Sequence, residues 1–144
     1  MLLSAYNAAV VGTVFMLFPM GYFLLTSPTF LLVKLDVPQV SFLLRSQFSG
    51  YFMTVVGAGL VSTAGFAFAG RPLFAAGAAA IMVFSFLARR WFLRRIDGEI
   101  AAREAGDHAA TARLRRLHVG GMLCNLVELG VVMSAVPSIF AAPF

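Results

Sequence analysis

Charged side chains are scarce in this sequence. Asp, Glu, Lys and Arg make up 12% of the 144 residues, about half of what a soluble domain of this size carries. Hydrophobic residues make up 60%, which is more than a small protein can bury, because its surface is large relative to its volume. This composition excludes both an ordinary water-soluble globule and intrinsic disorder. The remaining class is an integral membrane protein, and the length predicts a single domain, residues 1–144.

Cysteine and the usual signatures of soluble enzymes are almost absent as well. The single cysteine, Cys124, cannot form a disulfide within the chain. The sequence lacks a phosphate-binding glycine loop, a nucleophile elbow and a zinc-binding His-Glu helix. Only two histidines are present, and the few potential ligands are not spaced as in a metal site. We therefore predict no metal, haem or other cofactor, and the sequence favours a non-enzymatic role.

Long stretches without charge mark the expected membrane spans. No charged residue occurs in residues 1–33, 46–70 or 72–88, and Glu128 is the only one in residues 117–144. A helix crosses the hydrocarbon core with about 20 apolar residues, whereas the strands of a membrane barrel alternate apolar and polar residues. Because these runs are continuous, we predict an all-α bundle of four transmembrane helices. The helices are expected near residues 3–26, 48–70, 72–95 and 115–138.

The segment between the first two spans is apolar but contains prolines. Pro28 and Pro38 interrupt it, so one regular helix over residues 26–47 is not expected. Its many Phe and Leu residues predict that it lies along the membrane interface or packs under the bundle. Pro19 is expected to kink the first helix, and Pro137 is expected to fray the last one.

The basic residues lie almost entirely on one side of the predicted membrane. Ten of the eleven Lys and Arg residues lie in or beside the two long connections, one of which is the polar loop 97–114; only Arg71 lies on the other side. Because basic loops stay in the cytoplasm, we predict a multi-pass inner (plasma) membrane protein with both termini outside. This placement explains the net charge of +5 without a nucleic-acid partner. The expected partners are the lipid bilayer and its anionic headgroups.

Arginines around the end of the third span and the start of the fourth are predicted to contact lipid headgroups. Long Arg side chains extend from a helix end to the interface, and Trp prefers the same depth. The residues expected to make these contacts are Arg89, Arg90, Trp91, Arg94, Arg95, Arg115 and Arg116.

The polar residues of the last span fall on one face. At 100° per residue, His118, Met122, Asn125 and Glu128 share one side of a helix. With a rise of about 1.5 Å per residue, Glu128 lies roughly 15 Å deeper in the membrane than His118. A carboxyl group at that depth costs roughly 3 kcal/mol to insert, so it is expected to face the bundle interior. One hypothesis is that this face forms a ligand site or a proton relay.

A second hypothesis is that the same face only holds the helices together. Interhelical hydrogen bonds from Asn125 or Glu128 would contribute about 1 kcal/mol each. His118 would then bind a loop carbonyl or a headgroup. The expected hydroxyl partners are those of Thr54, Ser62, Thr63 and Ser85. The sequence pattern leaves the two hypotheses open.

Small residues gather in the second and third spans. Gly57, Gly59 and Gly65 belong to the second span, and residues 75–80 of the third are all Ala or Gly. Small residues let helix backbones approach closely. We predict that they pack within the bundle rather than against a second copy, while a homo-oligomer or a larger membrane complex stays open.

A run at the start of the last span carries a family resemblance. The run is Arg115-Arg116-Leu117-His118, followed by Met122-Leu123-Cys124-Asn125-Leu126. In this run and in the layout of its spans, the chain resembles the four-helix membrane family of largely unknown function that includes transmembrane protein 205. The resemblance matches His118, Met122 and Asn125 to the family's pattern, and Glu128 lies outside it. Gly120-Gly121 departs from the family's small residue and serine. The resemblance implies the four-helix fold and no settled molecular activity.

A weaker similarity is to the four-helix membrane enzymes of eicosanoid and glutathione metabolism. Those enzymes carry an Asn-x-x-Glu pair with nearby arginines for glutathione, and here Asn125 and Glu128 follow Arg115 and Arg116. The pair departs from that pattern because it lies on the last helix rather than the second. The similarity implies an alternative, a membrane-embedded glutathione-dependent enzyme acting on lipophilic substrates.

Three functions therefore follow from the sequence. The leading one is a small non-enzymatic polytopic membrane protein, with a polar intramembrane site or an accessory role in a membrane complex. The alternatives are the glutathione-dependent enzyme and a small proton-coupled transporter or channel in which Glu128 is the ionisable group.

Overall fold

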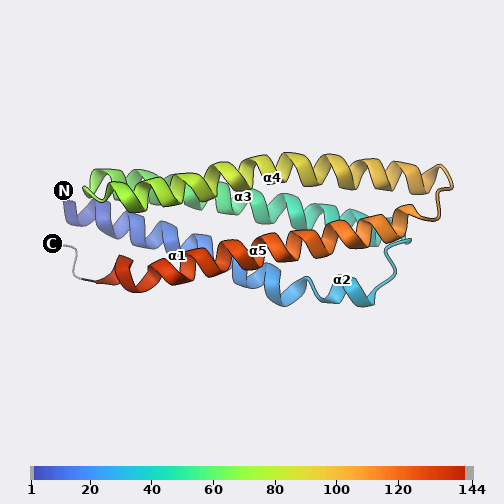
Figure 1. Cartoon of the computed structure of the whole chain (residues 1–144), viewed down its shortest axis with the longest axis horizontal. Coiled ribbons are helices and arrows are strands. Elements are labelled where there is room, and N and C mark those ends of the chain that lie inside the picture. The colour runs from blue at the N-terminus through green and yellow to red at the C-terminus, as the bar shows by residue number, and fades with distance from the viewer. Residues whose placement is uncertain (1, 142–144) are drawn as a thin grey trace.

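The computed structural model describes residues 2–141, which form a bundle of long helices (Figure 1). The helices are α1 (Leu2–Thr26), α2 (Thr29–Leu32), α3 (Pro38–Phe68), α4 (Pro72–Glu104) and α5 (Ala110–Phe140). Four helical segments are long and apolar enough to cross a membrane, and α2 adds only one turn after the first of them. The predicted all-α four-helix bundle is thus confirmed, and the chain is a multi-pass membrane protein. Residue 1 and residues 142–144 of the predicted domain lie outside the described residues.

Two helices extend farther than predicted at the arginine-rich end. α3 begins at Pro38 instead of near residue 48, and α4 continues to Glu104 instead of ending near residue 95. The expected loop 97–114 is therefore wrong in its extent, because only residues 105–109 separate α4 from α5. The predicted helix ends were placed where charged residues interrupt the apolar runs. A charged residue ends a hydrophobic run, but it does not end a helix. Pro38 is tolerated because it occupies the first turn, where no amide donor is needed.

The two prolines inside the long helices do not end them. Pro19 lies within α1, and α5 continues through Pro137 to Phe140, so the expected fraying at Pro137 is wrong. The last carbonyl groups of α5 have donors from outside the helix. Tyr6 donates its hydroxyl to the Ile139 carbonyl at 2.6 Å, and Arg71 donates to the carbonyls of Ser138 and Ile139 at 2.9 and 3.0 Å. These bonds satisfy groups that a helix end otherwise leaves without a partner.

The segment between α1 and α3 packs under the bundle. Leu35 is fully buried in the hydrophobic core. Arg103 of α4 donates to the Leu35 carbonyl at 2.8 Å, and Arg115 of α5 donates to the carbonyls of Leu31 and Val33. The arginines therefore supply the donors that an irregular backbone segment lacks.

Glycines bring α3 close to its neighbours. A Cβ atom on Gly65 would lie 2.6 Å from the backbone nitrogen of Ala9 in α1, and one on Gly59 would lie 2.9 Å from the Cβ of Met82 in α4. Gly57 has no such neighbour within 4 Å. The small residues that contact another helix therefore serve packing within the chain.

Candidate functional site

The polar face of α5 is turned into the bundle. His118 and Asn125 are fully buried, and Glu128 is 5% exposed. Met122 is half-buried at the edge of this face and packs against the core. The periodicity of the sequence thus correctly placed the three polar residues on one buried face. Buried polar groups are costly without hydrogen-bond partners. The partners of these three residues therefore bear on whether the face forms a ligand site or holds the helices together.

Glu128 joins three helices. Its Oε1 accepts a hydrogen bond of 2.6 Å from the Ser85 hydroxyl of α4, and its Oε2 accepts one from the Tyr51 hydroxyl of α3. Sequence reasoning missed Tyr51, although it is the only phenol in α3 and a buried phenol usually finds a hydrogen-bond partner. Glu128 is therefore a junction between α3, α4 and α5.

Of the four hydroxyl partners expected from the sequence, only Ser85 contacts this face. Thr54 is exposed and donates to the Gly50 carbonyl of its own helix at 2.9 Å. The hydroxyl oxygens of Ser62 and Thr63 are buried and have no hydrogen-bond partner among the described residues. Ser62 packs instead against Gly12, where a Cβ atom would lie 2.6 Å from its Oγ.

His118 and Asn125 bind backbone carbonyls. The Nδ2 of Asn125 donates to the Met20 carbonyl of α1 at 3.1 Å, and the Nε2 of His118 lies 2.8 Å from the Ser27 carbonyl just after α1. Since a carbonyl only accepts, the Nε2 of His118 carries the proton. The Nδ1 of His118 and the Oδ1 of Asn125 have no partner within residues 2–141. Glu128, Asn125 and His118 therefore bind different elements.

Aromatic rings surround His118. The ring centroids of Phe30, Phe48 and Phe23 lie 5.7, 6.0 and 6.4 Å from that of His118. The Phe48 ring also lies over Gly121, where any Cβ atom would collide with it. His118 is thus enclosed by apolar rings and has no exposed surface.

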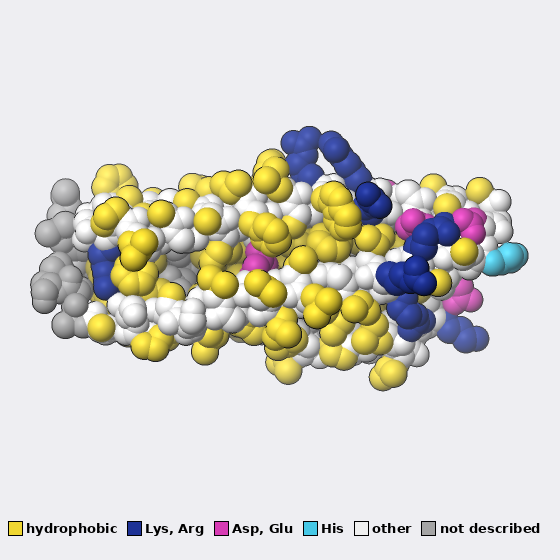
Figure 2. Space-filling model, viewed as in Figure 1, with side chains coloured by type: hydrophobic (Ala, Val, Ile, Leu, Met, Phe, Trp, Pro, Cys, Tyr) yellow, Lys and Arg dark blue, Asp and Glu magenta, His cyan; other side chains and the backbone are white. Residues whose placement is uncertain are grey.

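A cleft runs along the seam between α4 and α5, and we call it the α4–α5 cleft. It has three adjoining parts, with volumes of about 810, 430 and 360 Å³. Phe84 and Cys124 line both the first and the second part, while Ile81 and Val131 line both the second and the third. Glu128 lines the second part. Figure 2 shows that hydrophobic side chains dominate this face away from the arginine-rich end, with one small acidic patch near mid-length.

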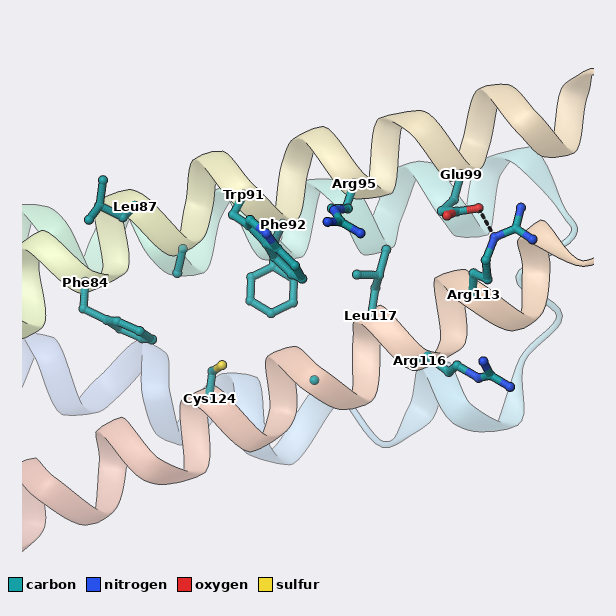
Figure 3. Close-up of a pocket in the computed structure, with 12 residues that line it drawn as sticks. Phe84, Leu87, Trp91, Phe92, Arg95, Glu99, Arg113, Arg116, Leu117 and Cys124 are labelled. Carbon is teal, nitrogen blue, oxygen red and sulfur yellow. Dashed lines mark hydrogen bonds and ion pairs between the residues drawn. The ribbon is translucent and has the colours of Figure 1, made fainter.

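The first part of the cleft combines apolar walls with an arginine-rich end (Figure 3). Leu87, Trp91 and Leu117 are among its apolar residues. At its polar end, Arg113 of α5 donates to Glu99 of α4 at 2.7 Å. This ion pair links the two helices where the cleft meets the arginine-rich end of the bundle (Figure 2).

The arginines predicted to meet headgroups fall into two groups. Arg115 binds the carbonyls of the segment after α1, and Arg89 donates to the Ser49 hydroxyl at 3.0 Å. These two therefore donate to acceptors within the protein. The other predicted residues are exposed or half-exposed, and their guanidinium groups make no hydrogen bond or ion pair in the described part of the chain. They are Arg90, Arg94, Arg95 and Arg116, with Trp91 beside them at 49% exposure.

These features define a multi-pass helical membrane protein with a laterally open cleft. Compared with protein-family models, with curated proteins and with solved structures, the chain matches none of them. Over residues 2–141, no three His, Cys, Asp or Glu side chains are grouped so that they could hold a metal ion. The geometry of the site therefore has to support any functional proposal by itself.

Proposed function

We propose that this chain is a non-enzymatic membrane protein that holds a lipophilic molecule in the α4–α5 cleft. The observation that carries this proposal is the continuity of the cleft, which runs from the arginine-rich end of the bundle to the level of Glu128 and beyond. The first part, at about 810 Å³, has the size of small-molecule sites. An apolar cleft of this size leaves its walls without dispersion partners unless an apolar guest fills it.

In this proposal, the polar residues of α5 position the helices that form the cleft and do not take part in a chemical reaction. The bonds from Ser85 and Tyr51 to Glu128 fix the distance between α5 and its neighbours at mid-length. A carboxylate offers about four acceptor sites, so a hydroxyl or amine of a guest still finds an acceptor there. Asn125 and His118 fix α5 to α1 and to the turn after it.

The orientation and the family are part of the same proposal. The one-sided arginines support an inner-membrane protein with the arginine-rich end in the cytoplasm and both termini outside. α1 begins and α5 ends at the same end of the bundle (Figure 1), as four spans require. The resemblance to the transmembrane protein 205 family supports membership of that family. Reporter fusions at the two termini test the orientation, and activity of a cytoplasmic reporter at either terminus would refute it.

The single tryptophan of the chain provides a direct test of the cleft. Trp91 lines its first part, and bromine atoms on an acyl chain quench tryptophan fluorescence on contact. Titration of the purified protein in detergent with a long-chain brominated alcohol should give saturable quenching. A linear, non-saturable response in the wild type would refute the proposal.

Two glycines of α5 provide a matched pair of variants for this test. Gly120 lines the cleft, with the nearest atom to an added Cβ at 3.9 Å, whereas Gly130 does not line it and has nothing within 4 Å. Gly120→Leu should fill the cleft and abolish saturable quenching, while Gly130→Leu should leave it unchanged. Equal quenching of the two variants would place the guest elsewhere.

A second candidate is proton-coupled transport, which one observation favours. Tyr51, Glu128 and Ser85 form a hydroxyl–carboxyl–hydroxyl chain across three helices inside the span, and intramembrane carboxyls often mark proton pathways. Proteoliposomes with an internal pH dye test it. Proton flux that Glu128→Gln abolishes without loss of folding would support transport, and absence of flux in the wild type would refute it.

The two remaining alternatives have separate tests. For the glutathione-dependent enzyme, Asn125 and Glu128 bind different helices, and Arg115 binds backbone carbonyls, so the geometry favours no shared thiol site. Absence of heat in a calorimetric titration with glutathione would remove that alternative. For an accessory subunit, a stoichiometric partner should co-purify in mild detergent.

A further inference from the structure

The arginine-rich end of the α4–α5 cleft has the chemistry of a phosphate site. We infer that it binds the phosphate of an anionic phospholipid through Arg95 and Arg116, with an acyl chain of that lipid in the cleft. The inference rests on the proposed function, because it names the class of lipophilic molecule that the cleft holds.

The charges at this end favour an anion. Four charged side chains line the first part of the cleft, namely Arg95, Glu99, Arg113 and Arg116. Arg113 is neutralised by Glu99 at 2.7 Å and by Asp107 at 2.6 Å. Arg95 and Arg116 make no ion pair among the described residues, so two guanidinium groups stay free for an anion and the net charge of these five side chains is +1. Guanidinium groups bind phosphate oxygens in pairs, which makes arginine a preferred phosphate ligand.

Arg95 lies on α4 and Arg116 lies on α5, and both line the first part of the cleft. In Figure 3 the Arg95 side chain lies between the two helices, whereas Arg116 points away from α4, so its long side chain has to turn toward Arg95 for the two to share one phosphate. Trp91 lies under the Arg95 guanidinium, whose central carbon is 4.9 Å from the ring centroid. Trp prefers the depth of lipid headgroups, so this end of the cleft has the side chains expected at the membrane interface.

The first two parts of the cleft together match the thickness of one leaflet. Arg116 and Glu128 are separated by twelve residues, which is about 18 Å along a helix. One leaflet of hydrocarbon is about 15 Å thick, half of the bilayer core. A lipid whose phosphate binds Arg95 and Arg116 would therefore extend its chain past Leu117 and Cys124 to the level of Glu128. A soluble phosphate compound would leave these apolar walls empty, which is why a lipid is the occupant we infer.

Two other arginines provide a matched control. Arg90 and Arg94 lie on α4 but do not line the first part of the cleft. Replacing both removes the same charge from the same end of the bundle as replacing Arg95 and Arg116. Non-specific attraction of the basic surface for anionic lipid would weaken equally in the two double variants, whereas a site in the cleft would weaken in only one.

The experiment compares two brominated lipids on the whole protein in neutral detergent. Quenching of Trp91 by phosphatidylglycerol should half-saturate at an at least tenfold lower lipid fraction than quenching by phosphatidylcholine. Arg95→Ala with Arg116→Ala should abolish this preference, Arg95→Lys with Arg116→Lys should keep part of it, and Arg90→Ala with Arg94→Ala should keep it whole. Arg95 stacks on Trp91, so replacing Arg95 can change the fluorescence of Trp91 directly. Native mass spectrometry, which counts the bound lipids, should therefore serve as a second readout.

The outcomes separate the inference from the proposal on which it rests. Saturable quenching by both lipids at equal fractions, or equal weakening in both alanine pairs, would overturn the phosphate site and leave the lipophilic cleft intact. Absence of saturable quenching by either lipid would overturn both. Inorganic phosphate that displaces the lipid at millimolar concentration would show a headgroup site that does not need the chain, which also contradicts the inference.

Discussion

The seam between α1 and α3 and the seam between α4 and α5 are built in different ways. At the first, Gly65 and Gly12 let the two backbones meet, with Ala9 and Ser62 where a Cβ atom would be. At the second, large side chains such as Phe84, Leu87 and Leu117 line a cleft. In a bilayer, lipid chains are as apolar as Leu, so no hydrophobic force closes a seam. The α1–α3 seam is thus closed at the points where glycines meet another backbone, whereas the part of the α4–α5 seam that is lined by large side chains stays open to lipid.

The open seam is held by polar contacts at separate points. Ser85 and Glu128 join α4 to α5 at mid-length, and Glu99 and Arg113 join them at the arginine-rich end. The closed seam depends on shape, and the open seam depends on hydrogen bonds. Three substitutions test whether the two seams are held in these different ways.

The largest effect is expected where the backbones meet. Gly65→Leu places a side chain against the Ala9 backbone, only 2.6 Å from an added Cβ, and should cost about 3 kcal/mol by overpacking. Gly57→Leu is the control, because nothing lies within 4 Å of its Cβ position. Thermal unfolding in detergent, followed by size exclusion, measures both. If the two variants melt together, the α1–α3 seam is not closed as described.

A smaller effect is expected at the midpoint of the open seam. Ser85→Ala removes the 2.6 Å bond to Glu128 and should cost about 1 kcal/mol, as membrane hydrogen bonds typically do. Ser134→Ala is the matched control, because Ser134 is exposed and donates only to the Val131 carbonyl of its own helix. Equal unfolding midpoints for the two variants would show that the Glu128 junction does not hold the seam.

The smallest effect concerns the exposed end of the open seam. The hydrogen bond from Arg113, together with one from the Ala109 amide, lowers the pKa of Asp107. A carboxylate with a lowered pKa stabilises the fold above its unfolded pKa of about 3.9, and this stability is lost as pH falls through the folded pKa. Asp107→Asn should therefore melt slightly below the wild type at pH 6, and the difference should shrink as the pH is lowered below about 3.9. A difference that does not shrink over that range would contradict this account.

The fold could be predicted from the sequence because hydrocarbon imposes a simple rule. Charge-free runs give the number of spans, and the 3.6-residue period places His118, Asn125 and Glu128 on one face. The apolar runs alone could not give the helix ends, since Arg45 and Asp97 lie in helices that continue past these runs and pair with each other there.

The partners of the polar face were predictable only in part. Ser85 was expected because a hydroxyl is a chemical match for a carboxyl. A loop carbonyl was expected for His118, and the structure confirms it at Ser27. Which carbonyl it is, and that Asn125 binds the carbonyl of Met20, could not be predicted, since every residue has a carbonyl and only the tertiary packing selects two of them. The cleft was not predictable either, because it depends on how far apart α4 and α5 lie, which no single helix encodes.

The way α5 is fastened has a mechanical consequence. One end is held by Arg113 with Glu99 and Asp107, and the other by Tyr6 and Arg71 at its last carbonyls. A helix that is held at both ends can widen the cleft beside it by bending, but not by rotating about one end. Ser85 and Tyr51 also hold α5 at mid-length through Glu128, so exchange of a guest would bend α5 and loosen these bonds while both ends stay intact. The residence time of a guest in the cleft would therefore depend on the mid-length bonds more than on the bonds at the two ends.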